Sequence, residues 1–249
     1  MLMKCVDIFK SFKVGRRKVE VLKGCSIAVD EGEMVVLFGE SGCGKTTLAR
    51  VILMLVKPDT GKVLFKGREV KPTREFRRRV QYIPQNPNEA LNPRWRIYDS
   101  IAEPLRVHSL VETRKEEFDA VAAIAEKVGL KEEHLHRKPS ELSGGELQRA
   151  IIARALILEP EFIVCDEPTS MLDVSVQAAI VRMLMDIQRK TGVSYLFITH
   201  DLGLAMAIAD RMYVMNGGRV IRELRREELQ GLSTESLIRC GLPRASVRF

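Results

Sequence analysis

One short segment carries the clearest chemistry in this chain of 249 residues. From Gly39 to Thr46 it reads G-E-S-G-C-G-K-T, which fits the G-x-x-x-x-G-K-T pattern of a phosphate-binding loop. Glycines there let backbone N–H groups close around phosphate oxygens. We expect Lys45 to contact the β- and γ-phosphates of a nucleoside triphosphate, and the Thr46 hydroxyl to ligate Mg²⁺. The residues predicted to bind the nucleotide here are Gly39, Glu40, Ser41, Gly42, Cys43, Gly44, Lys45, Thr46 and Thr47.

The segments on either side of this loop are those that it needs. Met34–Phe38 is a continuous apolar run, typical of a strand buried on both faces. Thr47–Val56 has no internal glycine or proline and stops before Lys57-Pro58, so we predict a helix there. A helix N-terminus adds partial positive charge beside a phosphate. A chance glycine-rich turn is the alternative, and these flanks make it much the poorer interpretation.

A pair of carboxylates forms a second candidate group. Asp166 and Glu167 follow the apolar run Phe162–Cys165, so they stand at the end of a predicted buried strand. Neighbouring strand residues point to opposite sides. Asp166 is therefore expected in the magnesium shell, and Glu167 is expected to orient the attacking water, a role worth roughly 10²–10⁴ in rate. The alternative is an acidic pair on the surface.

Histidines offer weaker signals. His200 follows the apolar run Val193–Thr199, at the sheet edge where ligands collect in α/β proteins, and could donate to a γ-phosphate. A lone histidine is more often structural, so this hypothesis depends on position alone. His134 and His136 could in principle bind a metal, but we expect exposed side chains.

Composition limits the class of protein. Hydrophobic residues make up 45% and charged residues 29%, as in an ordinary globular protein. The apolar runs are far shorter than the roughly 20 residues that span a bilayer. Asp7 interrupts the N-terminus and no signal peptide is visible, so we expect a cytosolic location. Five scattered cysteines without a C-x-x-C disfavour both a disulfide framework and a zinc site.

The net charge of +7 suits a polyanionic partner in general. Basic clusters occur at Arg77–Arg79 and at Arg222, Arg225 and Arg226. A solvated charged face is the better interpretation of each cluster, because no aromatic residues for base stacking are interleaved with them. No nucleic-acid partner is expected.

The remaining pattern predicts the elements around these groups. Short apolar runs between Lys4 and Val29 indicate antiparallel strands, with Phe12 in a turn at Lys10–Lys13. Further strands are expected at Lys62–Gly67 and Val80–Ile83, and a hairpin at Met212–Ile221.

Between Asn88 and Pro160 helical patterns dominate. Capping boxes begin helices at Thr113 and Ser143, and Gly129 suits the end of the first of them. The apolar residues of that first helix recur at helical spacing and are expected to be buried. They are Phe118, Val121, Ala122, Ala125 and Val128.

Together these elements predict an α/β fold. It has a P-loop NTPase core with a mainly parallel sheet, an N-terminal antiparallel β subdomain and an inserted helical subdomain. We predict a single domain over 1–249: residues 1–87 and 160–222 form the core with the β subdomain, 88–159 the helical subdomain, and 223–249 a C-terminal tail.

In this order the motifs resemble those of the nucleotide-binding subunit of an ABC transporter. The matching positions are the phosphate loop (39–46), Gln85, the signature Leu142–Glu146, Asp166–Glu167, Ser170–Asp173 and His200. The resemblance covers about residues 4–222 and is very specific.

The family implies an ATPase that works as a pair. Two subunits, identical or paralogous, meet head to tail, and each ATP lies between one phosphate loop and Ser143, Gly144 and Gly145 of the other subunit. Phe12 falls where the family places an aromatic that stacks on adenine. The resemblance also implies roles for Gln85 at both the magnesium and the catalytic site, beside Glu167 and His200. The cofactors implied are ATP and Mg²⁺.

A narrower likeness concerns Gln85–Arg94, Ile101–Leu105, Ser170–Gln177 and Leu196–Leu202, which are similar to importers of the oligopeptide, dipeptide and nickel group. Larger members carry a longer C-terminal extension with a cysteine cluster, so the single Cys240 here favours shorter, nickel-type or metallophore-type members. The resemblance implies membrane permease partners, an extracytoplasmic solute-binding protein and a place on the cytoplasmic face of the membrane. A soluble ATPase of phosphonate degradation or DNA repair is the alternative.

Overall fold

The computed structural model describes residues 1–231; the rest of the tail, including Cys240, lies outside this range. Contacts divide the chain into two compact units. The first consists of Met1–Pro72 and the chain from Val193 onward, and the second is Thr73–Gly192. Within residues 1–231 no helix combines the length and hydrophobicity that a membrane span requires.

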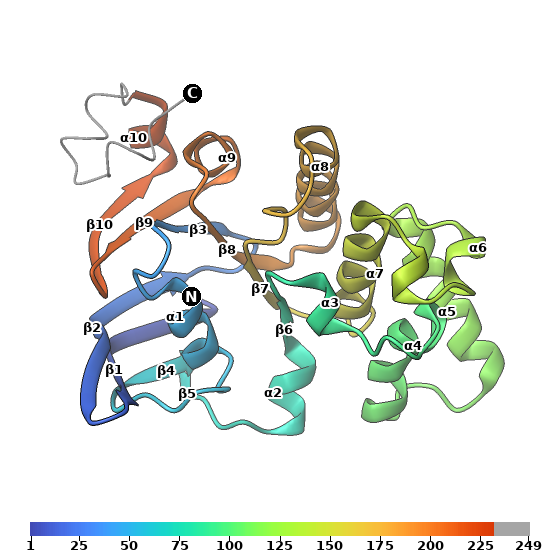
Figure 1. Cartoon of the computed structure of the whole chain (residues 1–249), viewed down its shortest axis with the longest axis horizontal. Coiled ribbons are helices and arrows are strands. Elements are labelled where there is room, and N and C mark those ends of the chain that lie inside the picture. The colour runs from blue at the N-terminus through green and yellow to red at the C-terminus, as the bar shows by residue number, and fades with distance from the viewer. Residues whose placement is uncertain (232–249) are drawn as a thin grey trace. The chain divides into compact units, whose positions relative to one another are not determined.

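An antiparallel sheet of four strands lies in the first unit, in the order β2-β1-β4-β5 (Figure 1). The strands are β1 (Met3–Val14), β2 (Arg17–Val29), β4 (Thr60–Phe65) and β5 (Arg68–Glu69). The antiparallel prediction is confirmed, but the predicted turn at Phe12 is wrong. Phe12 lies within β1 opposite Val19, and the chain reverses at Gly15, which has a positive φ of 60°. Glycine adopts that conformation readily, whereas it is strained for phenylalanine.

The first unit also contains four strands in the order β10-β9-β3-β8. They are β3 (Met34–Gly39), β8 (Ser194–Thr199), β9 (Arg211–Asn216) and β10 (Arg219–Arg225). β3 pairs in parallel with both β8 and β9, and every residue of β3 and β8 is buried. The apolar runs and the hairpin are therefore confirmed. The helices of this unit are α1 (Lys45–Ile52), α9 (Leu202–Ile208) and α10 (Arg226–Gly231).

Helix α1 is shorter than predicted, because it ends at Ile52 instead of Val56. Met54 takes a positive φ of 55°, and the backbone N–H groups of Leu55 and Val56 turn back to the carbonyl oxygen of Arg50. This left-handed turn satisfies a terminal carbonyl and stops the helix.

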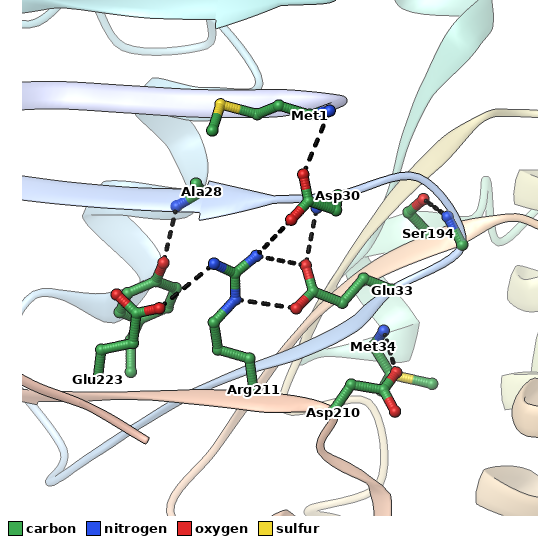
Figure 2. A network of polar contacts seen from close by, with 11 residues as sticks. Met1, Ala28, Asp30, Glu33, Met34, Ser194, Asp210, Arg211 and Glu223 are labelled. Atoms are coloured by element: carbon green, nitrogen blue, oxygen red, sulfur yellow. Dashed lines mark hydrogen bonds and ion pairs between the residues drawn. The ribbon is translucent and has the colours of Figure 1, made fainter. Parts of the chain in front are cut away.

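Arg211 on β9 joins several elements of the first unit (Figure 2). Its guanidinium makes two bonds to the Glu33 carboxylate, Nε to Oε1 at 2.8 Å and Nη2 to Oε2 at 2.5 Å. It also lies 3.2 Å from Asp30 and 3.3 Å from Glu223. Paired bonds between arginine and carboxylate are strong and directional. They hold the turn before β3 against the β9–β10 hairpin.

The second unit pairs two parallel strands with a set of helices. Its strands are β6 (Val80–Ile83) and β7 (Phe162–Asp166). Its helices are α2 (Arg74–Arg79), α3 (Pro87–Ala90), α4 (Ile97–His108), α5 (Arg114–Lys127), α6 (Glu132–Leu135), the 3₁₀ turn η1 (Pro139–Glu141), α7 (Gly144–Leu156) and α8 (Val174–Thr191). Six of these lie between residues 88 and 160 or begin at Pro87, so the helical character predicted there is confirmed.

Helix α5 corrects two details. Phe118 is 44% exposed, whereas the charged Glu117 beside it is buried. Glu117 accepts hydrogen bonds from the Arg106 guanidinium at 2.7 and 2.6 Å and from the Tyr98 hydroxyl at 3.0 Å. A buried carboxylate needs such partners, and apolar periodicity cannot reveal them. The Thr113 hydroxyl caps the helix as predicted, but the Glu116 carboxylate binds the N–H of Glu112, so the reciprocal bond is absent among these residues.

The cysteines of the described chain are buried thiols. They are Cys5, Cys25, Cys43 and Cys165. Burial raises the pKa of the Cys5 and Cys165 thiols well above the ordinary value. Both therefore behave as small apolar side chains.

Candidate active site

The phosphate-binding loop connects β3 to α1. Gly42 and Gly44 take positive φ angles of 80° and 110°, which suit glycine. A Cβ atom on Gly39 would lie 2.4 Å from the carbonyl oxygen of Met215, and one on Gly44 would lie 2.9 Å from its side chain. Gly39 is thus required by a neighbour, the end of β9, whereas Gly44 is favoured both by its neighbours and by its own backbone conformation.

Lys45 lies over this loop. Its Nζ donates to the carbonyl oxygens of Gly39 at 2.8 Å and Glu40 at 2.9 Å, and the residue is 5% exposed. A positive charge held against the loop by two carbonyl oxygens fits a phosphate group as ligand. Thr46 and Thr47 follow in the first turn of α1 and are half-buried.

The turn between β9 and β10 braces the loop from one side. The N–H of Gly218 donates to the carbonyl oxygen of Cys43 at 3.1 Å. The Gly218 carbonyl accepts from the N–H of Lys23 at 2.8 Å and from the Cys25 thiol at 3.1 Å. The hairpin turn thereby links the loop to β2. The sequence predicted the hairpin at Met212–Ile221 but not this contact.

His200 lies where the parallel pairing predicted it. Phe38 of β3 is in register with Thr199 of β8, so Gly39, the last residue of β3, and His200, which follows β8, lie at the same edge of the sheet. The side chain of His200 is exposed.

Phe12 occupies the exposed part of the β1–β2 ribbon. It is 37% exposed, and Lys10 Nζ lies 5.5 Å from its ring centroid. Its register partner is Val19 on β2. Two residues further along β2, the carbonyl oxygen of Val21 would lie 3.1 Å from a Cβ on Gly44. The strand beside Phe12 therefore borders the phosphate-binding loop.

In the second unit, the ends of β6 and β7 bring three candidate residues together. Asp166 is 1% exposed and accepts from the Tyr82 hydroxyl at 3.1 Å. Glu167 accepts from the side-chain amide of Gln85 at 3.1 Å. Glu167 also takes a positive φ of 45°, which is unusual for a residue with a side chain. Tyr82 was not predicted as a site residue. It lies on β6 one residue before Ile83, which pairs with Cys165, and this position next to the end of β7 could have indicated it.

The signature segment begins α7 as predicted. Ser143 is the N-cap: its hydroxyl accepts from the Glu146 N–H at 3.4 Å, and the Glu146 carboxylate accepts from the Ser143 N–H at 2.8 Å. Ser143 and Gly144 are exposed. A Cβ on Gly145 would lie 2.7 Å from the Val176 side chain, so glycine lets the start of α7 pack against α8.

His134 is buried, and the expected exposure of this residue is wrong. It is 6% exposed, and its Nδ1 accepts from the N–H of Lys131 at 3.2 Å, while its Nε2 faces Glu146. The ring caps the short helix α6, which explains the burial. His136 is exposed, as predicted, and within residues 1–231 no group of three or more histidines, cysteines, aspartates or glutamates is arranged to hold a metal ion.

Comparison with known proteins agrees with this arrangement. The family model "ABC transporter" matches residues 22–170. The chain belongs to the ABC transporter family. It is 42% identical over 234 residues to the oligopeptide transport ATP-binding protein OppF of Bacillus subtilis (strain 168), covering 92% of this chain and 77% of the relative. It is 40% identical to the di/tripeptide transport ATP-binding protein DppF of Pseudomonas aeruginosa (strain UCBPP-PA14), covering 86% and 67%.

Solved structures give the same result. The dimeric structure of MJ0796, a bacterial ABC transporter cassette, matches with a TM-score of 0.82 and 28% identity, covering 90% of this chain and 99% of that chain. The cbiO1 protein from Clostridium perfringens, part of an ABC transporter complex, matches with a TM-score of 0.81 and 25% identity, covering 98% and 97%. The predicted fold class is confirmed. The chain is an ABC-type ATPase that hydrolyses ATP for transport.

Proposed function

We propose that this chain is the ATPase of a peptide importer. In this proposal Glu167 activates the attacking water, and a second cassette completes each ATP site. The observation that supports its catalytic part best is the Glu167 carboxylate, which accepts a bond from Gln85 at 3.1 Å beside the buried Asp166. A carboxylate held by one neighbour is oriented to receive a proton from water.

The phosphates of ATP would be held by the loop Gly39–Thr47, with Lys45 supplying the positive charge. Phe12 would stack on the adenine ring, a contact worth about 1–3 kcal/mol. Thr46, Gln85 and Asp166 would surround Mg²⁺, which supplies positive charge to the phosphate oxygens. The buried Asp166, fixed by Tyr82, suits this role because a buried carboxylate needs a positive or donor partner.

Two residues would act on hydrolysis itself. Glu167 would orient and polarise the attacking water. His200, at the sheet edge where Gly39 begins the phosphate-binding loop, would donate to the γ-phosphate. No arginine is required for this purpose in the same chain.

The exposed Ser143 and Gly144, with Gly145, would cover the ATP held by a second cassette. A helix N-terminus offers backbone N–H groups and partial positive charge to an anion. The solved MJ0796 structures are dimeric, and one of them is described as a post-hydrolysis state bound to ADP and Pi. The second cassette here is an identical or a paralogous chain.

Peptide is the cargo that we propose, because the relatives named above are oligopeptide and di/tripeptide transport proteins. Nickel or a metallophore, which the sequence left open, is not specifically supported by these relatives. The permease and an extracytoplasmic solute-binding protein complete the proposed complex, with this chain on the cytoplasmic face of the membrane. Co-purification with a permease supports this assignment, whereas a stable complex with soluble metabolic enzymes contradicts it.

The decisive experiment uses Glu167→Gln. This variant should keep ATP binding, lose hydrolysis by roughly 10²–10⁴ and accumulate as an ATP-bound pair of cassettes in size-exclusion chromatography. Near-normal turnover removes Glu167 from the catalytic role. Ser143→Arg in one cassette should disable the site that contains the Lys45 of the other, and unchanged activity would rule out a shared site.

A further inference from the structure

His134 is one of the buried polar side chains that the proposed function does not use. Its Nδ1 accepts the Lys131 N–H at 3.2 Å, so in the neutral ring the proton is on Nε2. That atom lies 3.3 Å from Oε1 of Glu146 and 3.6 Å from Oε1 of Glu133. Of the two carboxylates, Glu133 is mostly exposed and Glu146 is 31% exposed. Nε2 of His134 therefore lies within ion-pair distance of the carboxylate of the signature segment.

The Glu146 carboxylate makes a different contact with each oxygen. Oε2 accepts the backbone N–H of Ser143 at 2.8 Å, and Oε1 faces His134. The bond from the Ser143 N–H, followed by the Ser143 hydroxyl, lowers the pKa of Glu146. The carboxylate thus bridges the ring of His134 and the N-cap of α7.

We propose that His134 is a positioning residue for the signature segment. It holds the Glu146 side chain in the rotamer that binds the Ser143 N–H, and so fixes the direction in which Ser143 and Gly144 face a partner's nucleotide. This inference rests on the proposed shared site. Its physical basis is that a glutamate side chain has several rotamers, and a second contact on its free oxygen removes most of them.

The chain offers variants that separate the two contacts of the ring. In His134→Asn the side-chain oxygen stands near Nδ1 and can still accept from Lys131, but nothing reaches Glu146. In His134→Gln the amide N–H stands near Nε2 and can still reach Glu146. Glu133→Ala is the matched control, because it removes the more distant carboxylate from the same ring nitrogen.

The measurement separates nucleotide binding by one chain from pairing. Each variant also carries Glu167→Gln. If the chain copurifies with a different cassette, the two proteins are used together. A fluorescent ATP analogue reports binding at the phosphate-binding loop. Size-exclusion chromatography over a range of ATP concentrations, with Mg²⁺ present, reports pairing.

We expect His134→Asn to bind the analogue with unchanged affinity and to need about fivefold more ATP for half-maximal pairing, the size of effect typical of a lost N-terminal cap. His134→Gln should restore most of the pairing, and Glu133→Ala should pair normally. The double variant His134→Asn/Glu146→Ala should pair about as well as Glu146→Ala alone, because the two residues act as one unit.

The outcomes distinguish the inference from the proposed function. Normal pairing of His134→Asn, while Ser143→Arg abolishes pairing, overturns the role of His134 alone. Equal loss in His134→Gln and His134→Asn also overturns it, because the contact with Glu146 would then not matter. If Ser143→Arg pairs normally, or if the Glu167→Gln protein never pairs, the shared site fails and this inference fails with it.

Discussion

The hairpin turn beside the phosphate-binding loop allows a controlled test with two adjacent glycines. Gly217 and Gly218 have φ angles of 53° and 84°, so alanine is strained at both, by roughly 1–2 kcal/mol. Only Gly218 is packed: a Cβ there would lie 2.4 Å from the carbonyl oxygen of Val21, whereas a Cβ on Gly217 meets nothing within 4 Å. Gly217→Ala is therefore a control for the backbone cost.

In Gly218→Ala the turn must move away from β2 and from the loop. That movement breaks the bond between the Gly218 N–H and Cys43 and the bond from Lys23 to the Gly218 carbonyl. Each is worth about 1 kcal/mol. We expect Gly218→Ala to lower the free energy of unfolding by about 2 kcal/mol more than Gly217→Ala does. Because Cys43 belongs to the phosphate-binding loop, ATP affinity should fall by about tenfold, equivalent to about 1.4 kcal/mol.

Urea unfolding followed by circular dichroism measures the first quantity, and titration with a fluorescent ATP analogue below the unfolding transition measures the second. Equal losses of stability in the two variants would refute the steric argument. A destabilised Gly218→Ala protein with normal ATP affinity would refute the claim that the turn braces the loop.

Three further predictions concern other parts of the chain. Arg211→Ala removes the paired bonds to a mostly buried carboxylate and should lower the free energy of unfolding, measured in urea, by about 1.5–3 kcal/mol. A smaller loss than in a variant of a surface arginine would show that these bonds do not stabilise the fold. The hydrogen bond from Arg106 lowers the pKa of Glu117, so this pair should stabilise the fold above about pH 4.5, the ordinary value, and lose that contribution as pH falls through the lowered pKa. Thermal unfolding from pH 7 to pH 3 should show a smaller pH dependence in Glu117→Gln, and an identical pH dependence counts against the pair. Gly145→Ala places a Cβ 2.7 Å from Val176 and should lower the melting temperature by an amount equivalent to about 1–3 kcal/mol, whereas an unchanged melting temperature means that the helices separate freely.

The local motifs were predictable because their chemistry is encoded in short stretches. The strand, loop and helix around Lys45 follow from one apolar run and one glycine pattern. The capping box at Ser143 and the hairpin after Met212 follow likewise. Parallel pairing then predicted that His200 lies at the edge of the sheet where the loop begins, and the register of Phe38 with Thr199 confirms that position.

What sequence reasoning missed are the polar contacts of buried side chains, whether the partner lies on another helix or a few residues away. Glu117 is buried because Arg106 and Tyr98 neutralise it, so the expected burial of Phe118 was wrong. His134 is buried because its own backbone neighbour binds the ring. Neither partner can be identified from apolar periodicity, which indicates only where apolar side chains recur.

The backbone at Glu167 has a consequence for how this enzyme responds to selection. A side chain at a φ of 45° holds the chain in a conformation that glycine would adopt with about 1 kcal/mol less strain. Under the catalytic role proposed for Glu167, a screen that rewards heat resistance alone should thus enrich Glu167→Gly and return cassettes that bind ATP but hydrolyse it slowly. On that proposal, stability and turnover make opposite demands at this one position.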